Sequence, residues 1–333
     1  CRPSAITSGH TPTSEPTSHA ASFSTPTGPA TAATSPQPVI MSDPAQALKD
    51  FQPSHNFFIG IDSDGCVFDT MEIKHKECFA PMFIKHFRLQ PASKYAREVW
   101  EFVNLYSKTR GCNRFHAIIR ALELMRNRRE TQARNLAVPS FPALEEWMAR
   151  ESKLGNATLY AEVDGGNEAL IPIREWSDAV NAQVEDIAHG VPPFPLVRKC
   201  LEILNAQADC MVISQTPVDA LEREWSEHGI DHHVRLIAGQ ELGTKKEHLG
   251  FSTSGKYKPE NVLMIGDAPG DHKAATANGA LFFPVNPGEE SASWKHLLDE
   301  GLDRFFSGTY SGEYQRRLLD KFDACLPETP PWE

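Results

Sequence analysis

The sequence lacks features that would place it in a membrane, in an oxidising compartment or on nucleic acid. Its 333 residues contain no run of about 18 apolar residues, the length that spans a bilayer. Its seven cysteines are odd in number and form no CxxC pair, which is typical of a reducing cytoplasm. Positive charge is scarce, because 33 Lys and Arg stand against 44 Asp and Glu, for a formal net charge of −11. Nucleic-acid binding depends on clustered Lys and Arg, so this balance argues against it.

Large apolar side chains are almost missing from residues 1–40, which contain 15 Ser or Thr and 7 Pro. Such a segment cannot bury enough surface to offset the entropy of ordering it, so we expect it to be disordered and place residues 1–52 outside the folded core. The leading Cys1 has two interpretations. It is either a lipid-anchored terminus or part of an extension upstream of a true start at Met41. We favour the second, with a cytoplasmic location.

Five short apolar runs have the length and composition of buried parallel strands. They are residues 57–61, 210–213, 234–237, 262–265 and 281–285. Helical segments separate the last four, which indicates βαβ units. We therefore predict an α/β fold with a doubly wound, Rossmann-like parallel sheet.

The long interval between the first two runs has no comparable strand signal and reads as helical. Apolar residues recur there at i, i+3 and i+4 among charged ones, over residues 73–89, 94–107, 113–130, 143–151 and 175–187. We predict an inserted helical cap over residues 72–191. The core would comprise residues 53–71 and 192–333, with residues 195–206 returning the chain to it and a helical tail over residues 294–306 and 312–326.

Pairs of carboxylates follow the first and fourth predicted strands. Asp62 and Asp64 follow the first, and Asp267 and Asp271 follow the fourth. Ligands of open α/β sheets bind beyond the carboxyl ends of the strands, so these side chains are placed where a substrate can reach them. Carboxylate oxygens suit Mg²⁺, which also relieves their mutual repulsion. The sequence therefore predicts a magnesium site.

The second predicted strand ends at Ser214-Gln215, where a hydroxyl and the amides of a helix start can hold phosphate oxygens. A Gly-containing basic loop opens a helix within the predicted cap. Arg110, Asn113 and Arg114 of this loop are candidates for contacting anionic groups of a substrate.

These elements, in this order, resemble the haloacid dehalogenase superfamily. The motifs are DxDGxxxDT at residues 62–70, Ser214 after an apolar strand, a lysine before the fourth strand, and GDxxxD at residues 266–271. The resemblance implies the phosphatase branch, with a helical cap of the C1 type at the insertion point. It also implies Asp62 as nucleophile and Asp64 as general acid and base, a role that members cleaving carbon–halogen bonds do not need.

The resemblance further implies the ligands of the phosphate and the metal. Ser214 and a lysine would hold the phosphate. Mg²⁺ would be held by Asp62, by Asp64 through its backbone carbonyl, and by Asp267 with support from Asp271. The lysine has several candidates. Lys245 stands where a helix after the third strand would begin, its neighbour Lys246 is the alternative, and Lys256 and Lys258 lie further along the chain.

We therefore expect a Mg²⁺-dependent phosphomonoester hydrolase acting on a small phosphorylated metabolite through an aspartyl phosphate. A phosphomutase would share these residues and return the phosphoryl group to its substrate. A non-catalytic binding protein that kept the fold is the third alternative, and the intact set of acidic residues argues against it. The oligomeric state is left open.

Overall fold

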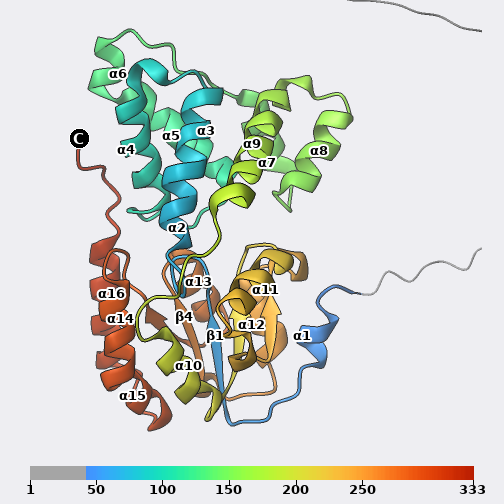
Figure 1. The fold of residues 1–333 in the computed structure, drawn as a ribbon, viewed down its shortest axis with the longest axis vertical. Helices are drawn as coiled ribbons and strands as arrows, with labels where there is room; N and C mark the ends of the chain where they lie inside the picture. Colours follow the sequence, from blue (N-terminus) through green and yellow to red (C-terminus); the bar gives the residue numbers. More distant parts are fainter. Residues whose placement is uncertain (1–42) are drawn as a thin grey trace, which may run out of the picture. The chain divides into compact units, whose positions relative to one another are not determined.

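The computed structural model describes residues 43–333, in which five parallel strands form one sheet in the order β3-β2-β1-β4-β5 (Figure 1). Their bounds are β1 Phe57–Ile61, β2 Ala208–Ile213, β3 Leu236–Ala238, β4 Val262–Gly266 and β5 Leu281–Pro284. The predicted parallel α/β sheet is confirmed. Strand β2 begins two residues earlier than predicted, and β3 begins two residues later, because the amide of Val234 bonds to Asp231 O in a preceding turn.

Side chains of the central strands alternate between two buried faces. Ile59 and Ile61 of β1 belong to one hydrophobic cluster, whereas Phe58 belongs to another on the opposite face. Both faces are buried, so β1 and β4 carry no polar side chain, and β2 carries only Asp209 near its start. The chain moves outward from β1 in one direction through β2 and β3, then resumes on the other side with β4. The switch point of the sheet therefore lies between β1 and β4.

Helices cover both faces of this sheet. The first cluster includes residues of α10 and α11 and of the later helices α14 and α15, and the second includes residues of α1, α12, α13 and α16. The bounds are α1 Gln46–Asp50, α10 Val197–Asn205, α11 Val218–Glu227, α12 Lys245–Thr253, α13 Pro269–Ala277, α14 Glu290–His296, α15 Leu302–Phe306 and α16 Glu313–Cys325. The predicted tail helix over residues 294–306 is divided, because a π-helical stretch over Leu297–Gly301 separates α14 from α15.

A helical insertion, residues 70–187, separates β1 from β2. Its elements are α2 Thr70–Ile73, a π-helical stretch Lys74–Phe79, α3 Ala80–His86, α4 Ser93–Asn104, α5 Arg114–Asn127, α6 Arg129–Ala133, α7 Pro142–Arg150, α8 Asn156–Asp164 and α9 Ile171–Ile187. The insertion has its own hydrophobic cluster, which includes the fully buried Trp100, Trp147 and Trp176. Helix α8 was not among the predicted helices, since only Leu159 of its residues is buried and its apolar periodicity is weak.

The extension predicted over residues 1–52 is too long. Helix α1 lies within it, and Leu48 and Phe51 are buried in the cluster that includes Phe58. Lys256 Nζ donates hydrogen bonds to the carbonyl oxygens of Leu48 and Lys49, which ties α1 to the core. The interpretations of Cys1 and Met41, and the disorder expected for residues 1–40, concern positions outside the described residues.

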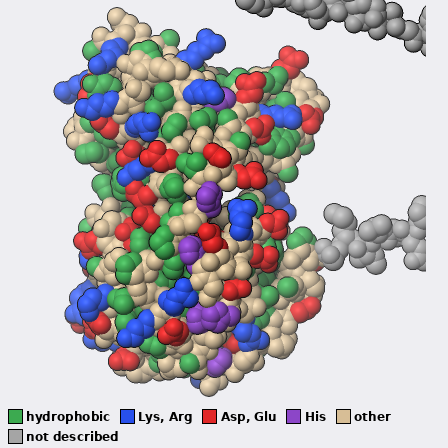
Figure 2. Space-filling view, in the orientation of Figure 1, with side chains coloured by type: hydrophobic (Ala, Val, Ile, Leu, Met, Phe, Trp, Pro, Cys, Tyr) green, Lys and Arg blue, Asp and Glu red, His purple; other side chains and the backbone are tan. Residues whose placement is uncertain are grey.

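The described surface carries mixed charge. Figure 2 shows Lys and Arg side chains interspersed with Asp and Glu on the face in view. Among the described residues, no helix combines the length and the apolar character needed to cross a membrane.

Candidate active site

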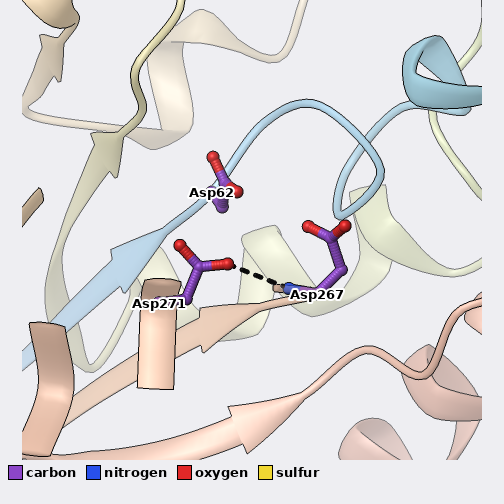
Figure 3. Close-up of side chains that lie close together, drawn as sticks. All are labelled: Asp62, Asp267 and Asp271. Atoms are coloured by element: carbon purple, nitrogen blue, oxygen red, sulfur yellow. Dashed lines mark hydrogen bonds between the residues drawn. The ribbon is translucent and has the colours of Figure 1, made fainter. Parts of the chain in front are cut away.

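Three buried carboxylates meet at the switch point of the sheet (Figure 3). Asp62 follows β1, Asp267 follows β4 and Asp271 lies in the first turn of α13, and one oxygen from each lies within 4.8 Å of the others. Their exposed fractions are 4%, 1% and 0%. Because β1 and β4 are adjacent and parallel, with Ile61 paired to Ile265, their carboxyl ends bring these residues together. We call Asp62, Asp267 and Asp271 the carboxylate cluster.

Asp62 is held from both sides of its carboxylate. Its Oδ1 accepts a hydrogen bond of 2.8 Å from the amide of Ser63, and its Oδ2 accepts one of 2.5 Å from Lys245 Nζ. Burial raises the pKa of Asp62 well above its ordinary value, and the charge of Lys245 opposes the rise. Additional positive charge nearby would favour the ionised form of this carboxylate.

Lys245 bridges the cluster. Its Nζ lies 2.5 Å from Asp62 Oδ2 and 2.6 Å from Asp271 Oδ1. Thr244 caps α12 in a reciprocal capping box with Glu247, which places Lys245 at the first position of the helix. Burial by itself disfavours the ammonium, but the charges of Asp271 and Asp62 outweigh it and raise the pKa of Lys245. The alternative, Lys246, is exposed.

Asp271 shapes the loop that carries Asp267. Its Oδ2 accepts hydrogen bonds from the amides of Asp267 at 3.2 Å and Ala268 at 3.0 Å, the first of which is drawn in Figure 3. Gly266 is required beneath it, because a Cβ there would lie 2.5 Å from the side chain of Asp271. With Oδ1 bound to Lys245, both oxygens of Asp271 are engaged.

Asp267 has one engaged oxygen and one free oxygen. Oδ2 accepts hydrogen bonds from Arg110 Nε at 2.8 Å and Nη2 at 2.6 Å, whereas the buried Oδ1 has no hydrogen-bond partner in the described structure. Burial raises the pKa of Asp267 to about 6, and the charge of Arg110 limits the rise. An unpartnered buried carboxylate oxygen is costly, and a cation bound at Oδ1 would remove that cost.

The three residues of the basic loop lie in different surroundings. Arg110, expected to contact substrate, instead binds Asp267. Asn113 caps α5 by accepting a hydrogen bond from the amide of Phe115. Arg114 donates to Ser177 Oγ at 2.9 Å and Asn181 Oδ1 at 2.8 Å, within the insertion. The described contacts of Asn113 and Arg114 therefore do not include the carboxylate cluster.

Asp64 lies outside the carboxylate cluster. Its Oδ1 accepts hydrogen bonds from Thr70 Oγ1 and, at 2.5 Å, from Lys74 Nζ, and its Oδ2 accepts one of 2.6 Å from Thr216 Oγ1. Burial alone would raise the pKa of Asp64, but the charge and hydrogen bond of Lys74, with those of Thr216 and Thr70, lower it to about 2. The side chain of Asp64 is thus not placed as a metal ligand.

Sequence reasoning missed Lys74 and Thr216 as partners of Asp64. One signal for Lys74 was available: it follows Thr70 by four residues, which on a helix places the two side chains on the same face.

Ser214 and Gln215 lie at the carboxyl end of β2. Ser214 is buried, and its Oγ accepts a hydrogen bond of 3.3 Å from the amide of Thr216. The side-chain amide of Gln215 donates to the carbonyl oxygens of Ser214 and Gly243, so it braces the loop before α12. The Ser214 hydroxyl remains able to donate to a ligand, whereas the donor group of Gln215 is engaged with the backbone.

A second layer supports the loop between Asp62 and Asp64. The hydroxyl of the fully buried Ser63 donates to Glu224 Oε2 at 3.2 Å and accepts from Trp225 Nε1 at 3.0 Å. Burial, followed by the negative charge of Asp64, raises the pKa of Glu224 to about 7. Both supporting residues come from α11, another element that sequence reasoning did not connect to the site.

The donor set of the carboxylate cluster fits a hard divalent cation. All three side chains offer carboxylate oxygens, the ligands that Mg²⁺ and Ca²⁺ prefer, and Asp267 Oδ1 is without a partner. Among the described residues, this is the one group of three or more His, Cys, Asp or Glu side chains with metal-ligand spacing.

Comparisons with known proteins find a family similarity for part of the chain. Residues 147–285 match the family model described as haloacid dehalogenase-like hydrolase. No curated protein matches the sequence. The matched segment holds Ser214, Lys245, Asp267 and Asp271, and the sheet joins them to Asp62 and Asp64 of the first motif.

Several solved structures show a distant likeness. A haloacid dehalogenase-like hydrolase from Streptococcus pneumoniae is 12% identical, with 72% of this chain and 90% of that chain covered and a TM-score of 0.39. A putative haloacid dehalogenase-like hydrolase from Bacteroides fragilis is 15% identical (71% and 92% covered, TM-score 0.44). A putative β-phosphoglucomutase from Bacteroides vulgatus is 12% identical (80% and 100% covered, TM-score 0.41).

The family match, the ordered motifs and the parallel sheet that assembles them all point to a haloacid dehalogenase-like hydrolase. Members of this family typically use a divalent metal, and the buried cluster of Asp62, Asp267 and Asp271 is suited to one. Over residues 147–285, the chain is similar to the haloacid dehalogenase-like hydrolases.

Proposed function

We propose that the protein is a Mg²⁺-dependent phosphatase that hydrolyses a small phosphorylated metabolite through an aspartyl phosphate on Asp62. The observation that carries this proposal is the pairing of Asp62 with Lys245 beside Asp267, whose Oδ1 is free. An ammonium bound to the nucleophile lowers the repulsion that a phosphate dianion would otherwise meet from a carboxylate.

The charges of the site support a metal-assisted reaction. Four carboxylates (Asp62, Asp64, Asp267 and Asp271) face three cations (Lys74, Arg110 and Lys245), which leaves one formal negative charge when all are ionised. A phosphate group would add further negative charge. Mg²⁺, when bound, would neutralise phosphate oxygens and hold them in place. Asp62 and Asp267 would hold it, with Asp271 orienting the loop.

The proposed reaction has two steps. In the first, an Asp62 oxygen attacks phosphorus, the bond to the leaving oxygen breaks, and Asp64 donates a proton to that oxygen. In the second, Asp64 takes a proton from water, the water oxygen attacks phosphorus, and Asp62 is released with inorganic phosphate. Lys245 and the Ser214 hydroxyl would hold phosphate oxygens during both steps.

The ion pair with Lys74 favours the ionised form of Asp64, which is the form that the second step needs. For the first step it must carry a proton, so substrate binding has to weaken the ion pair with Lys74. Because Lys74 belongs to the insertion, this requirement links the chemistry to the helical insertion, which we propose is a cap of the C1 type over residues 72–191. We place the protein in the cytoplasm.

The experiment that tests the function is a screen of phosphorylated metabolites for release of inorganic phosphate in the presence of Mg²⁺. Wild-type protein should release phosphate, and Asp62→Asn should not. Asp219→Asn is a matched control, because Asp219 is an exposed acid in the first turn of α11, without a role in the proposed site. Transfer of the phosphoryl group back to the substrate, without release to water, would identify a mutase instead.

A further inference from the structure

The contact between Arg110 and Asp267 is one-sided. Two nitrogens of the guanidinium, Nε at 2.8 Å and Nη2 at 2.6 Å, bind the same oxygen, Asp267 Oδ2. A side-by-side pairing would instead use both carboxylate oxygens. The remaining oxygen, Oδ1, is buried and without a partner among the described residues. Arg110 therefore divides the Asp267 carboxylate into one occupied and one free oxygen.

Arg110 is firmly seated. The third nitrogen of its guanidinium, Nη1, donates to Leu105 O at 2.8 Å, and the side chain is only 2% exposed. Gly65, at φ +75°, leaves the space that the guanidinium fills, because a Cβ there would lie 2.6 Å from both Arg110 Nη2 and Asp267 Oδ2. Releasing Oδ2 would break two charge-assisted hydrogen bonds in a buried site.

Protein cations hold one oxygen of each carboxylate in the cluster. Lys245 binds Asp62 Oδ2 and Asp271 Oδ1, and Arg110 binds Asp267 Oδ2. Backbone amides occupy the other oxygens of Asp62 and Asp271, so a metal ion at this place would meet Asp267 Oδ1 as the one oxygen of the cluster without a partner among the described residues. Of the three, Asp267 is the one whose second oxygen depends on a residue from the insertion.

Magnesium and calcium differ in their use of carboxylates. Mg²⁺ takes six ligands in near-octahedral geometry and binds carboxylates through single oxygens, whereas Ca²⁺ takes six to eight and readily binds both oxygens of one carboxylate. We propose that Arg110 is a specificity-determining residue that restricts Asp267 to single-oxygen coordination and so favours Mg²⁺ over Ca²⁺. This inference rests on the magnesium site of the proposed function.

The test is the ratio of the dissociation constants for Ca²⁺ and Mg²⁺, measured by isothermal titration calorimetry on chelator-treated full-length protein. In Arg110→Met the ratio Kd(Ca²⁺)/Kd(Mg²⁺) should fall about tenfold from the wild-type value, because Asp267 gains a second oxygen that Ca²⁺ uses better. Loss of a positive charge by itself strengthens binding of both dications alike and leaves the ratio unchanged.

Lys74→Met is the matched control. It removes one positive charge that the insertion supplies to the same site, but Lys74 binds Asp64 and holds no oxygen of the carboxylate cluster. The ratio in this variant should stay within twofold of wild type. If circular dichroism shows Arg110→Met to be unfolded, Arg110→Gln, which is also too short to hold Oδ2, takes its place.

Two results would overturn the inference: an unchanged ratio in a folded Arg110 variant, or wild-type protein that binds Ca²⁺ at least as tightly as Mg²⁺. Wild-type protein that binds neither ion would instead refute the proposed metal site, and with it the inference.

Discussion

Lys74 Nζ lies 2.5 Å from Asp64 Oδ1, so the insertion supplies the counter-ion of the residue that we propose as acid and base. The pair is largely buried, with side-chain exposed fractions of 15% for Lys74 and 14% for Asp64. At such a site the ion pair strongly favours the ionised carboxylate, which explains the pKa of about 2 for Asp64. The readiness of Asp64 to give up a proton is therefore set by a residue outside the core.

Replacing Lys74 should change which leaving groups react well. In Lys74→Met the pKa of Asp64 rises, so its protonated form becomes more available at neutral pH. The ratio of kcat/KM for an alkyl phosphate to that for an activated aryl phosphate should rise by about threefold or more, since only the alkyl leaving group needs the proton. Lys74→Arg, which keeps the charge, should retain the wild-type ratio. Equal changes for both substrates would show that Lys74 does not act through Asp64.

Asp62 and Asp64 should behave differently when each is changed to Asn. Asp62→Asn should abolish turnover, because an amide is a poor nucleophile and a weaker metal ligand. Asp64→Asn should lose most turnover, yet it keeps the attacking group, so an activated aryl phosphate should still phosphorylate Asp62. Intact-mass spectrometry of acid-quenched protein should show a phosphorylated species in Asp64→Asn and none in Asp62→Asn. Phosphate on a serine or histidine would rule out the proposed mechanism.

Glu224 should make stability depend on pH. Its pKa is about 7 in the folded protein against 4.5 for the ordinary group, so the folded state binds the proton more tightly. The corresponding stabilisation is complete below pH 4.5 and is lost as pH rises through 7. Glu224→Gln removes this dependence. The free energy of unfolding of Glu224→Gln minus that of wild type should therefore increase by about 1–3 kcal/mol from pH 5 to pH 8.

Thermal unfolding at several pH values measures this difference. Glu222→Gln is the control, because Glu222 is exposed on the same helix and should show no such trend. A difference in free energy of unfolding between Glu224→Gln and wild type that stays constant across this range would contradict a raised pKa of Glu224 in the folded protein.

Trp332, which follows α16 in the sequence, should stabilise the protein through its contacts with the insertion. Its ring meets that of Phe102 edge-on at 5.5 Å, and the guanidinium of the buried Arg128 lies 4.3 Å from its centre. Trp332→Ala removes both contacts and should lower the free energy of unfolding by about 1–3 kcal/mol. Trp332→Phe, which keeps an aromatic face, should recover about half of the loss in urea-induced unfolding. No change in Trp332→Ala would mean that the contact is absent in solution.

Much of the core and of the carboxylate cluster could be predicted from the sequence. The strands contain continuous apolar runs, which a parallel sheet buried on both faces requires at β1, β4 and, after Asp209, in β2. The acids follow directly after β1 and β4, so the parallel order alone brings them to one edge. Helices with few buried residues, such as α1 and α8, carry too little apolar periodicity to be recognised this way.

The sequence narrowed the active-site lysine to Lys245 or Lys246 but did not decide between them. Both lie in the first turn of α12, and the sequence places either near the start of that helix. The capping box of Thr244 and Glu247 decides where the helix begins, and one position along a helix turns a side chain by about 100°. Lys245 consequently faces Asp62, while Lys246 faces solvent.

The tertiary structure alone decided which residues of the insertion contact the acidic residues that follow the strands. The sequence by itself determined the order of the strands' motifs, the acidic residues after them and the presence of a helical insertion, because these depend on neighbouring residues and local periodicity. It did not determine that Arg110 binds Asp267, or that Lys74 is the counter-ion of the Asp64 side chain. Arg110 and Asp267 are separated by 157 positions, and their contact exists only because two independently packed hydrophobic clusters place a loop and a strand end together.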